Sequence, residues 1–265
     1  MSFHIVTADS QSHWDAIVPI GGWIAAQNQP PGIPNERWAQ NISVTWYGSG
    51  DAMADAIAGG LNPPNNRARV MIDELRGNSI QIVADCARAM RTRYPQFAGR
   101  WGCYLVNGTG IAYTGLQPAI DELLDARAMI ACEFYAHQSD YQKAGDTAGE
   151  RDTWLGDFFR GSRGSFPQGR LHWLVQRRKS RGSDSHISAL FGVTDKFIGD
   201  WTFLDRMFYV FVNKSGYRGL LLADNGGAGS WKWDREGMSS SSRDVRFADA
   251  WRWYCQQEKT SLSPR

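Results

Sequence analysis

With 265 residues, of which 42% are hydrophobic, the chain is long enough to bury one large core or two small ones. Charged residues make up 21%, which excludes wholesale disorder, and a formal net charge of +2 indicates no general affinity for nucleic acid or anionic membranes. Some of the twelve tryptophans must serve the core, but so many also favour a stacking surface for flat or ring-shaped ligands.

The first residues, "MSFHIVTADS", lack the basic region, the apolar region and the cleavage site of a secretion signal. We therefore expect a cytoplasmic protein by default, or a secreted one if a signal has been removed. No apolar run approaches the roughly 18 residues that a transmembrane helix needs. The cysteines form no CxxC pair, so we expect buried thiols rather than zinc ligands at Cys86, Cys103, Cys132 and Cys255.

Short apolar runs recur along the chain and predict strands. Most of them are continuous rather than alternating, as is typical of strands that are buried on both faces. The predicted strands are 3–8, 42–47, 69–73, 102–107, 129–136, 171–176, 187–193 and 208–213. The segment "GGWIAAQ" (21–27) is a ninth candidate, or a replacement for one of the eight.

Helical patterns lie between several of these runs. The predicted helices are 50–61, 78–94, 116–128, 151–161 and 244–258. The second is the clearest, with Ser79 as its expected N-cap. Alternation of about eight strands with helices predicts an α/β fold, a single (β/α)₈ barrel that occupies residues 1–265 and ends in a C-terminal helix. No G-x-G-x-x-G follows the first strand, so a dinucleotide-binding half is not indicated.

The chemistry of such a barrel lies at the carboxyl ends of its strands. There the sequence provides three acids as candidate catalytic residues, Asp73, Glu74 and Glu133. The candidate substrate-binding residues are Tyr47, Asn107, Tyr135, His137, Asp195, Asn213, Trp231 and Trp233. The two tryptophans border the same mouth as Glu74 if segment 230–236 is extended, or pack against the side of the barrel.

Strand alternation connects these acids with particular faces of the sheet. If Val70 and Ile72 face the barrel interior, Glu74 does too, and Asp73 points toward the helix layer unless the strand ends before it. If Ala131 faces the interior, so does Glu133. Alternatives remain open, because Asp73 can cap the following helix and Glu133 can form an ion pair with an arginine such as Arg127 or Arg100.

Two facing carboxylates with aromatic walls are typical of glycoside hydrolysis. One acid protonates the leaving oxygen, and the other attacks the sugar or positions water. The sequence has no G-x-S-x-G, no H-E-x-x-H and no P-loop, and we expect no cofactor and no bound metal. The basic cluster "QRRKSRGSD" (176–184) is either a solvated loop or a contact for an anionic substrate.

The pattern resembles (β/α)₈-barrel glycoside hydrolases over most of the chain, through its architecture and the segments "MIDEL" and "ACEFYAH". An adjacent Asp-Glu at a strand end is similar to the acid pair of N-acetylhexosaminidase-type enzymes. That resemblance implies Glu74 as the acid and Asp73 as the group that orients the substrate acetamide. The sequence "ARVM" stands where those enzymes have a Gly-rich lead-in.

Three functional hypotheses follow from these residues. The first is a glycosidase that acts on a polysaccharide or oligosaccharide through Glu74 and Glu133. The second is a non-catalytic carbohydrate-binding or interaction barrel. The third is a metal-assisted hydrolase that uses Asp73, Glu133, His137 and Asp195.

Overall fold

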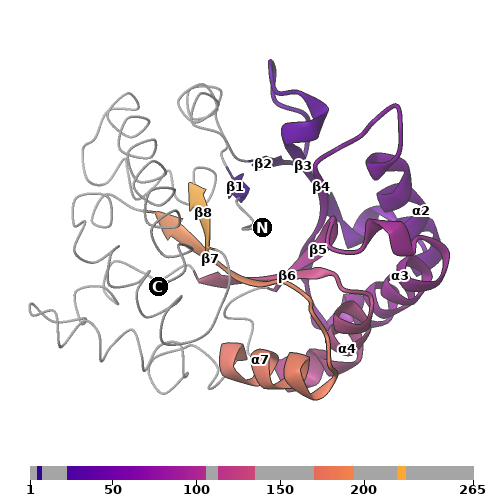
Figure 1. Cartoon of the computed structure of the whole chain (residues 1–265), viewed down its shortest axis with the longest axis vertical. Coiled ribbons are helices and arrows are strands. Elements are labelled where there is room, and N and C mark those ends of the chain that lie inside the picture. The colour runs from indigo at the N-terminus through magenta and orange to yellow at the C-terminus, as the bar shows by residue number, and fades with distance from the viewer. Residues whose placement is uncertain (1–4, 8–22, 106–112, 135–169, 194–219, 225–265) are drawn as a thin grey trace, which may run out of the picture.

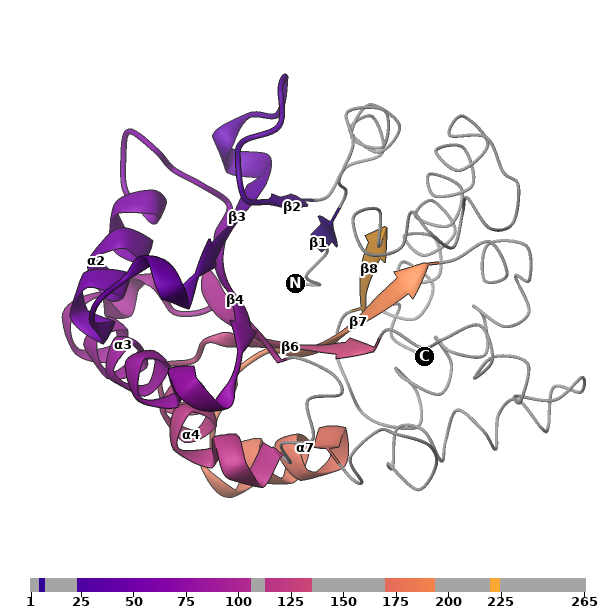
Figure 2. The ribbon, with the colours of Figure 1, turned by 180° about the vertical axis from the view of Figure 1, so that it is seen from behind.

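Eight parallel strands form a closed barrel in the computed structural model, with the strands in sequence order and β8 paired with β1 (Figures 1 and 2). The structure describes residues 5–7, 23–105, 113–134, 170–193 and 220–224. The strands are β1 (Ile5–Thr7), β2 (Trp23–Ala26), β3 (Trp38–Ser43), β4 (Arg69–Leu75), β5 (Trp101–Leu105), β6 (Met129–Phe134), β7 (Ile187–Val193) and β8 (Leu220–Asp224).

Helices cover the outside of this barrel along β3 to β7 (Figure 1). They are α2 (Gly50–Leu61), α3 (Ile80–Arg93), α4 (Gln117–Asp125) and α7 (Arg170–Ser180). Short 3₁₀ helices connect the elements: η2 (Asn35–Arg37), η3 (Val44–Trp46), η4 (Gly77–Ser79), η5 (Pro95–Phe97) and η6 (Tyr113–Leu116). In the described part of the chain, no helix is both long enough and apolar enough to span a bilayer.

The helices form where the sequence combines a cap with an apolar stripe. The Ser49 hydroxyl accepts a hydrogen bond from the Ala52 amide and so begins α2. The buried face of α2 includes Met53 and Ile57, and that of α3 includes Val83 and Met90. These stripes pack the helix layer against strands whose own residues are buried on both faces, as in β5.

The predicted alternation of parallel strands and helices is confirmed, and five predicted strands overlap β1, β4, β5, β6 and β7. Two assignments are corrected: residues 171–176 belong to α7 rather than to a strand, and β3 lies at 38–43 rather than 42–47. The candidate strand at 21–27 contains β2 and replaces the segment 171–176 in the count. Strand β8 was not predicted. The predicted segments 151–161, 208–213 and 244–258, the C-terminal helix among them, lie outside the described residues.

Val70 establishes which face of the strands is turned outward. A Cβ atom built on Gly60 of α2 would lie 3.2 Å from Cγ2 of Val70, so the Val70 side chain packs against the helix layer. The assumption that Val70 and Ile72 face the barrel interior is therefore wrong. Alternation instead assigns Met71 and Asp73 to the interior face.

The register between neighbouring strands extends this assignment of interior and outward faces from β4 to the other strands. Met71 pairs with Gly102 and Gly102 with Met129, so Ala131 and then Glu133 occupy interior-face positions of β6. The ladder followed the other way round the barrel assigns Glu133 to the same face. That route passes through the interior positions Ala39, Ala25, Thr7, Ala223, Gly192 and Leu190. The two routes agree, as they must in a closed barrel.

Candidate active site at the strand ends

Polar residues collect on the interior face at the carboxyl ends of four neighbouring strands. Ser43 and Asp73 are register partners on β3 and β4. Tyr104 of β5, which is only 2% exposed, pairs with Ala131, two residues before Glu133 of β6. Four successive strands therefore end in an interior-face hydroxyl or carboxylate residue, in the position where a (β/α)₈ barrel has its active site.

A β-bulge in β4 changes the strand-face assignment of positions 73 and 74. Ile72 pairs with Cys103 and Leu75 with Leu105, so positions 73 and 74 together oppose the single residue Tyr104. Counting forward from Val70 assigns position 73 to the interior. Counting back from Leu75, which shares the outward face of Leu105, assigns position 74 to the interior as well. The bulge thus assigns both positions of the Asp-Glu pair to the barrel interior.

Asp73 is half-buried, and its burial raises the pKa of its carboxyl group, while nearby Arg76 partly opposes the rise. No residue in the described ranges donates a hydrogen bond to this carboxylate. A carboxyl group in such surroundings can stay protonated at a higher pH than usual, which suits a proton donor or a hydrogen-bond donor to a ligand.

The alternative role of Asp73 as a helix cap is not supported. The Ser79 hydroxyl accepts a hydrogen bond from the Arg76 amide at 2.9 Å and donates one to the Arg76 carbonyl at 2.8 Å. These bonds close the turn before α3, and Asp73 has no part in them. Ser79 does stand at the N-cap position of α3 as predicted, although its side chain makes no capping bond to that helix.

The ion pairs proposed as an alternative for Glu133 are also disfavoured. Arg127 pairs with Asp184 at 3.2 Å, and Arg100 donates to the Arg67 carbonyl. Both arginines precede the first residue of their strands, whereas Glu133 is the fifth residue of β6. Six residues of extended chain separate it from Arg127 by roughly 20 Å. These arginines therefore lie at the opposite end of the barrel.

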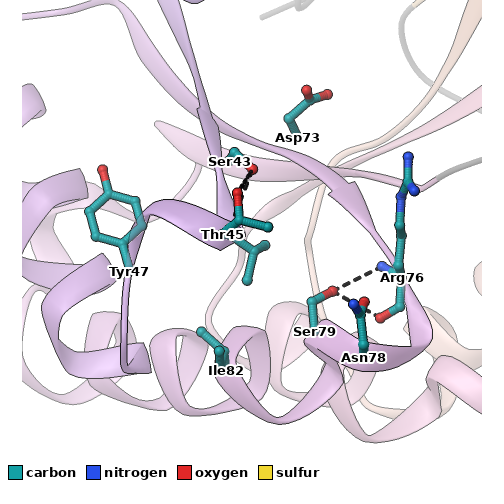
Figure 3. A pocket seen from close by; sticks show the side chains of 9 residues that line it. Ser43, Thr45, Tyr47, Asp73, Arg76, Asn78, Ser79 and Ile82 are labelled. Carbon is teal, nitrogen blue, oxygen red and sulfur yellow. Dashed lines mark hydrogen bonds between the residues drawn. The ribbon is translucent and has the colours of Figure 1, made fainter.

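A cavity of about 470 Å³ opens beside Asp73, between the end of β3 and the start of α3 (Figure 3). Its lining residues are Ser43, Val44, Thr45, Tyr47, Asp73, Arg76, Asn78, Ser79 and Ile82. Tyr47, a predicted substrate-binding residue, therefore lines the same cavity as Asp73. Burial raises the pKa of the Tyr47 phenol, while Arg67 opposes the rise, so the hydroxyl stays protonated near neutral pH.

The remaining candidates divide into two groups. Positions 74 and 133 lie at the expected end of the barrel, but their side chains lie outside what the structure describes, so a cleft shared by the two carboxylates remains a prediction. The other seven candidates fall in segments beyond the described residues: Asn107, Tyr135, His137, Asp195, Asn213, Trp231 and Trp233.

Sequence reasoning missed most of the cavity. Arg76 lies between β4 and η4, Asn78 lies in η4, and Thr45 lies in η3. The signal that could have identified them is the position of both loops directly after strand ends. Because 42–47 was predicted as a strand, residues 44–46 were not recognised as η3, which follows the carboxyl end of β3.

Two arginines of the basic cluster at 176–184 pair with acids of the helix layer. Arg177 binds Asp121 through two hydrogen bonds of 2.6 and 2.5 Å, and Arg181 binds Asp125 at 2.7 Å. Most of this cluster belongs to the end of α7 and precedes β7, so it lies at the amino ends of the strands. The prediction of an anionic-substrate contact is therefore not supported for these arginines.

Neither thiols nor metal ligands add to the site within the described ranges. Cys86, Cys103 and Cys132 are buried thiols, as expected, while Cys255 lies outside those ranges. No group of three His, Cys, Asp or Glu side chains in the described chain is arranged to hold a metal ion. Two residues of the metal-assisted alternative, His137 and Asp195, lie outside the described ranges.

Comparison with known proteins finds similarity in structure but not in sequence. No protein-family model matches the chain, and no curated protein matches it. The chain is similar in fold to a GH128 (subgroup III) curdlan-specific exo-β-1,3-glucanase from Blastomyces gilchristii, whose crystal structure contains glucose. The TM-score is 0.47 with 12% identity, over 93% of this chain and 96% of that chain. No residue role is transferred from that enzyme to this chain.

Proposed function

We propose that this protein is a glycoside hydrolase that uses Glu74 and Glu133 as its pair of catalytic carboxylates, with Asp73 as a third acid that orients the substrate. The observation that carries the proposal is the bulge in β4. The register on either side of this bulge supports an interior-face position for both 73 and 74, and the β5–β6 register supports the same face for position 133.

The spacing of the strands suits this chemistry. Strands β4 and β6 flank β5, so their backbones are roughly 10 Å apart. Side chains that converge from that distance reach the range of about 5 to 10 Å that separates the carboxyl groups of retaining and inverting glycosidases. Glu74 would protonate the leaving oxygen, and Glu133 would attack the sugar or activate water.

Tyr104 supports the assignment of Glu133. It lies on the strand between the two acids, occupies an interior-face position and is almost completely buried. A phenol in that position can donate a hydrogen bond to a carboxylate and hold it in one orientation. A buried carboxylate with such support is less costly than an isolated one.

The test is a screen of polysaccharides and aryl glycosides with the wild type beside Glu74→Gln and Glu133→Gln. Each substitution keeps size and hydrogen bonding but removes the titrating group, so turnover should fall by at least about 10²-fold. Glu36→Gln is the matched control, because Glu36 is exposed in η2, before the first residue of β3. That variant should keep full turnover.

Three outcomes would reject the proposal. A folded Glu133→Gln protein with full turnover would remove this carboxylate from the mechanism. Oligosaccharide binding without any hydrolysis would favour the non-catalytic barrel. Turnover that disappears with EDTA and returns with a divalent cation would favour metal-assisted hydrolysis.

A further inference from the structure

The cavity beside Asp73 combines an apolar floor with polar walls that come from two different loops. Figure 3 shows Tyr47 and Arg76 on opposite sides, Asp73 between them, and Ile82 below. Its volume of about 470 Å³ is within the usual range of ligand pockets, about 300 to 1,000 Å³. The cavity therefore has the dimensions and the mixed lining of a small-molecule site.

Some of the polar lining groups are already engaged with one another. Ser43 and Thr45 share a hydrogen bond of 2.9 Å, and Ser79 is bonded to the Arg76 backbone. By contrast, no described residue hydrogen-bonds the Tyr47 hydroxyl or the Asn78 amide. These two groups and the Asp73 carboxylate provide the donors and acceptors that a polyhydroxylated ligand requires.

An exposed aromatic residue is the sequence neighbour of two lining residues of this cavity. Trp46 lies between the lining residues Thr45 and Tyr47, and half of its surface, 50%, is accessible to solvent. It is the only large hydrophobic side chain found exposed in the described ranges. An exposed tryptophan beside polar groups suits a ligand that has one apolar and one hydroxylated face, as a sugar ring does.

Among the described lining residues, the formal charges balance. Arg76 lies close enough to Asp73 to stabilise its ionised form, so the lining has one positive and one negative group. An ionised uronic acid would be attracted by the first and repelled by the second. In the basic cluster at 176–184, the other candidate for anion binding, Arg177 pairs with Asp121 and Arg181 with Asp125.

We propose that this cavity is a subsite for a neutral hexosyl unit, which stacks on Trp46 and hydrogen-bonds Tyr47, Asn78 and Asp73. This subsite proposal rests on the proposed glycoside hydrolase function, because the same saccharide chain would extend from the cavity to Glu74 and Glu133. It specifies the substrate class as a neutral polysaccharide and assigns a binding role to Trp46 and Asn78.

Binding and turnover are measured separately to test it. The probes are neutral gluco-oligosaccharides of β-1,3, β-1,4 and α-1,4 linkage and an oligogalacturonate, titrated into the full chain by calorimetry. At least one neutral probe should bind more tightly than the oligogalacturonate. Trp46→Ala and Asn78→Ala should each weaken its binding about tenfold, the equivalent of about 1.4 kcal/mol.

Gln96→Ala is the matched control, since Gln96 is exposed in η5, before the first residue of β5. Its affinity should equal that of the wild type. If the enzyme turns over a neutral glycan but both cavity variants bind it like the wild type, the subsite is wrong and the proposed function stands. Preference for the oligogalacturonate overturns the charge argument. If no probe binds and no glycan is hydrolysed, both proposals fail.

Discussion

At the scale of single residues, the central feature is the pairing of Asp73 and Glu74 in one bulge. Simple alternation would assign neighbouring residues to opposite faces, so an adjacent acid pair would supply only one group to the barrel interior. The extra residue opposite Tyr104 removes that restriction. Burial at this point raises the pKa of Asp73, and that shift is open to measurement.

Asp73→Asn should stabilise the folded protein at neutral pH. Because the folded-state pKa of Asp73 is raised above 3.8, folding favours its protonated form, and ionisation weakens the fold. The stability that this acid contributes is fully present below the unfolded pKa and is lost as pH rises through the folded one. The advantage of the Asp73→Asn variant should therefore grow with pH over that window and then level off.

Urea denaturation of both proteins across pH 4 to 7 would measure this. Glu36→Gln should run parallel to the wild type, since that side chain is exposed. If the stability of the Asp73→Asn variant relative to the wild type does not change with pH, burial of Asp73 leaves its ionisation unaffected.

At the scale of elements, the close approach of β5 and β6 depends on one glycine. A Cβ atom at Gly102 would collide with the backbone carbonyl of Met129, which cannot move without shifting the strand. Gly102→Ala should therefore reduce the free energy of unfolding by about 3 kcal/mol. Gly59→Ala is the control, because nothing lies within 4 Å of a Cβ there and α2 should gain about 0.5 to 1 kcal/mol. Chemical denaturation of both variants would check the pair, and equal stability of the two would contradict the predicted collision.

A second prediction at this scale concerns the ion-pair network that joins α3, α4 and α7. Asp125 accepts hydrogen bonds from Arg181 at 2.7 Å and Arg91 at 3.1 Å, and the Arg181 pairing holds the pKa of Asp125 below its usual range. Asp125→Asn should lower stability by about 1 to 2 kcal/mol at neutral pH. The difference should shrink as pH falls through the folded-state pKa, because the protonated acid loses its pairing.

Asp184→Asn provides the comparison for this network. Its pair with Arg127 is mostly exposed, with side-chain accessibilities of 70% and 65%, so the change should stay within about 0.5 kcal/mol. Thermal unfolding at pH 7 and at a pH below 3.8 would distinguish the two acids. A similar loss at both positions would indicate that the network adds nothing beyond isolated surface pairs.

The sequence predicted the bounds of an element well where nearly all of its residues are apolar. It predicted them poorly where a polar residue of the element binds a partner that is distant in sequence. β7 was predicted at 187–193, its observed range. β3 was placed too late because it contains Gln40, which binds Arg67 on the next segment. The run 171–176 looked like a strand because it is apolar, but the arginines after it pair with α4 and extend a helix. The bulge in β4 is a register effect that no alternation rule could reveal.

At the scale of the whole molecule, the barrel is held together by short parallel pairings between neighbouring strands. Closure depends on β1 pairing with β8, and the consistent faces around the ring show that every strand contributes one interior and one outward surface. The eightfold count was within reach of sequence analysis, since the apolar runs alternate with helical patterns. By contrast, the residues that lie together at the barrel mouth could be identified only from the strand register.

The last prediction concerns cooperativity, since one closed ladder predicts one folding unit. If residues 1–265 form a single domain, calorimetry should give one transition whose van't Hoff and calorimetric enthalpies agree. Gly102→Ala in the barrel wall and Asp125→Asn in the helix layer should both move that same transition. For a chain of this size a loss of about 1 kcal/mol lowers Tm by about 2 to 4 °C, so Gly102→Ala should lower it by about 6 to 12 °C. Two transitions, one of them insensitive to Gly102→Ala, would show that a second unit folds independently of the barrel.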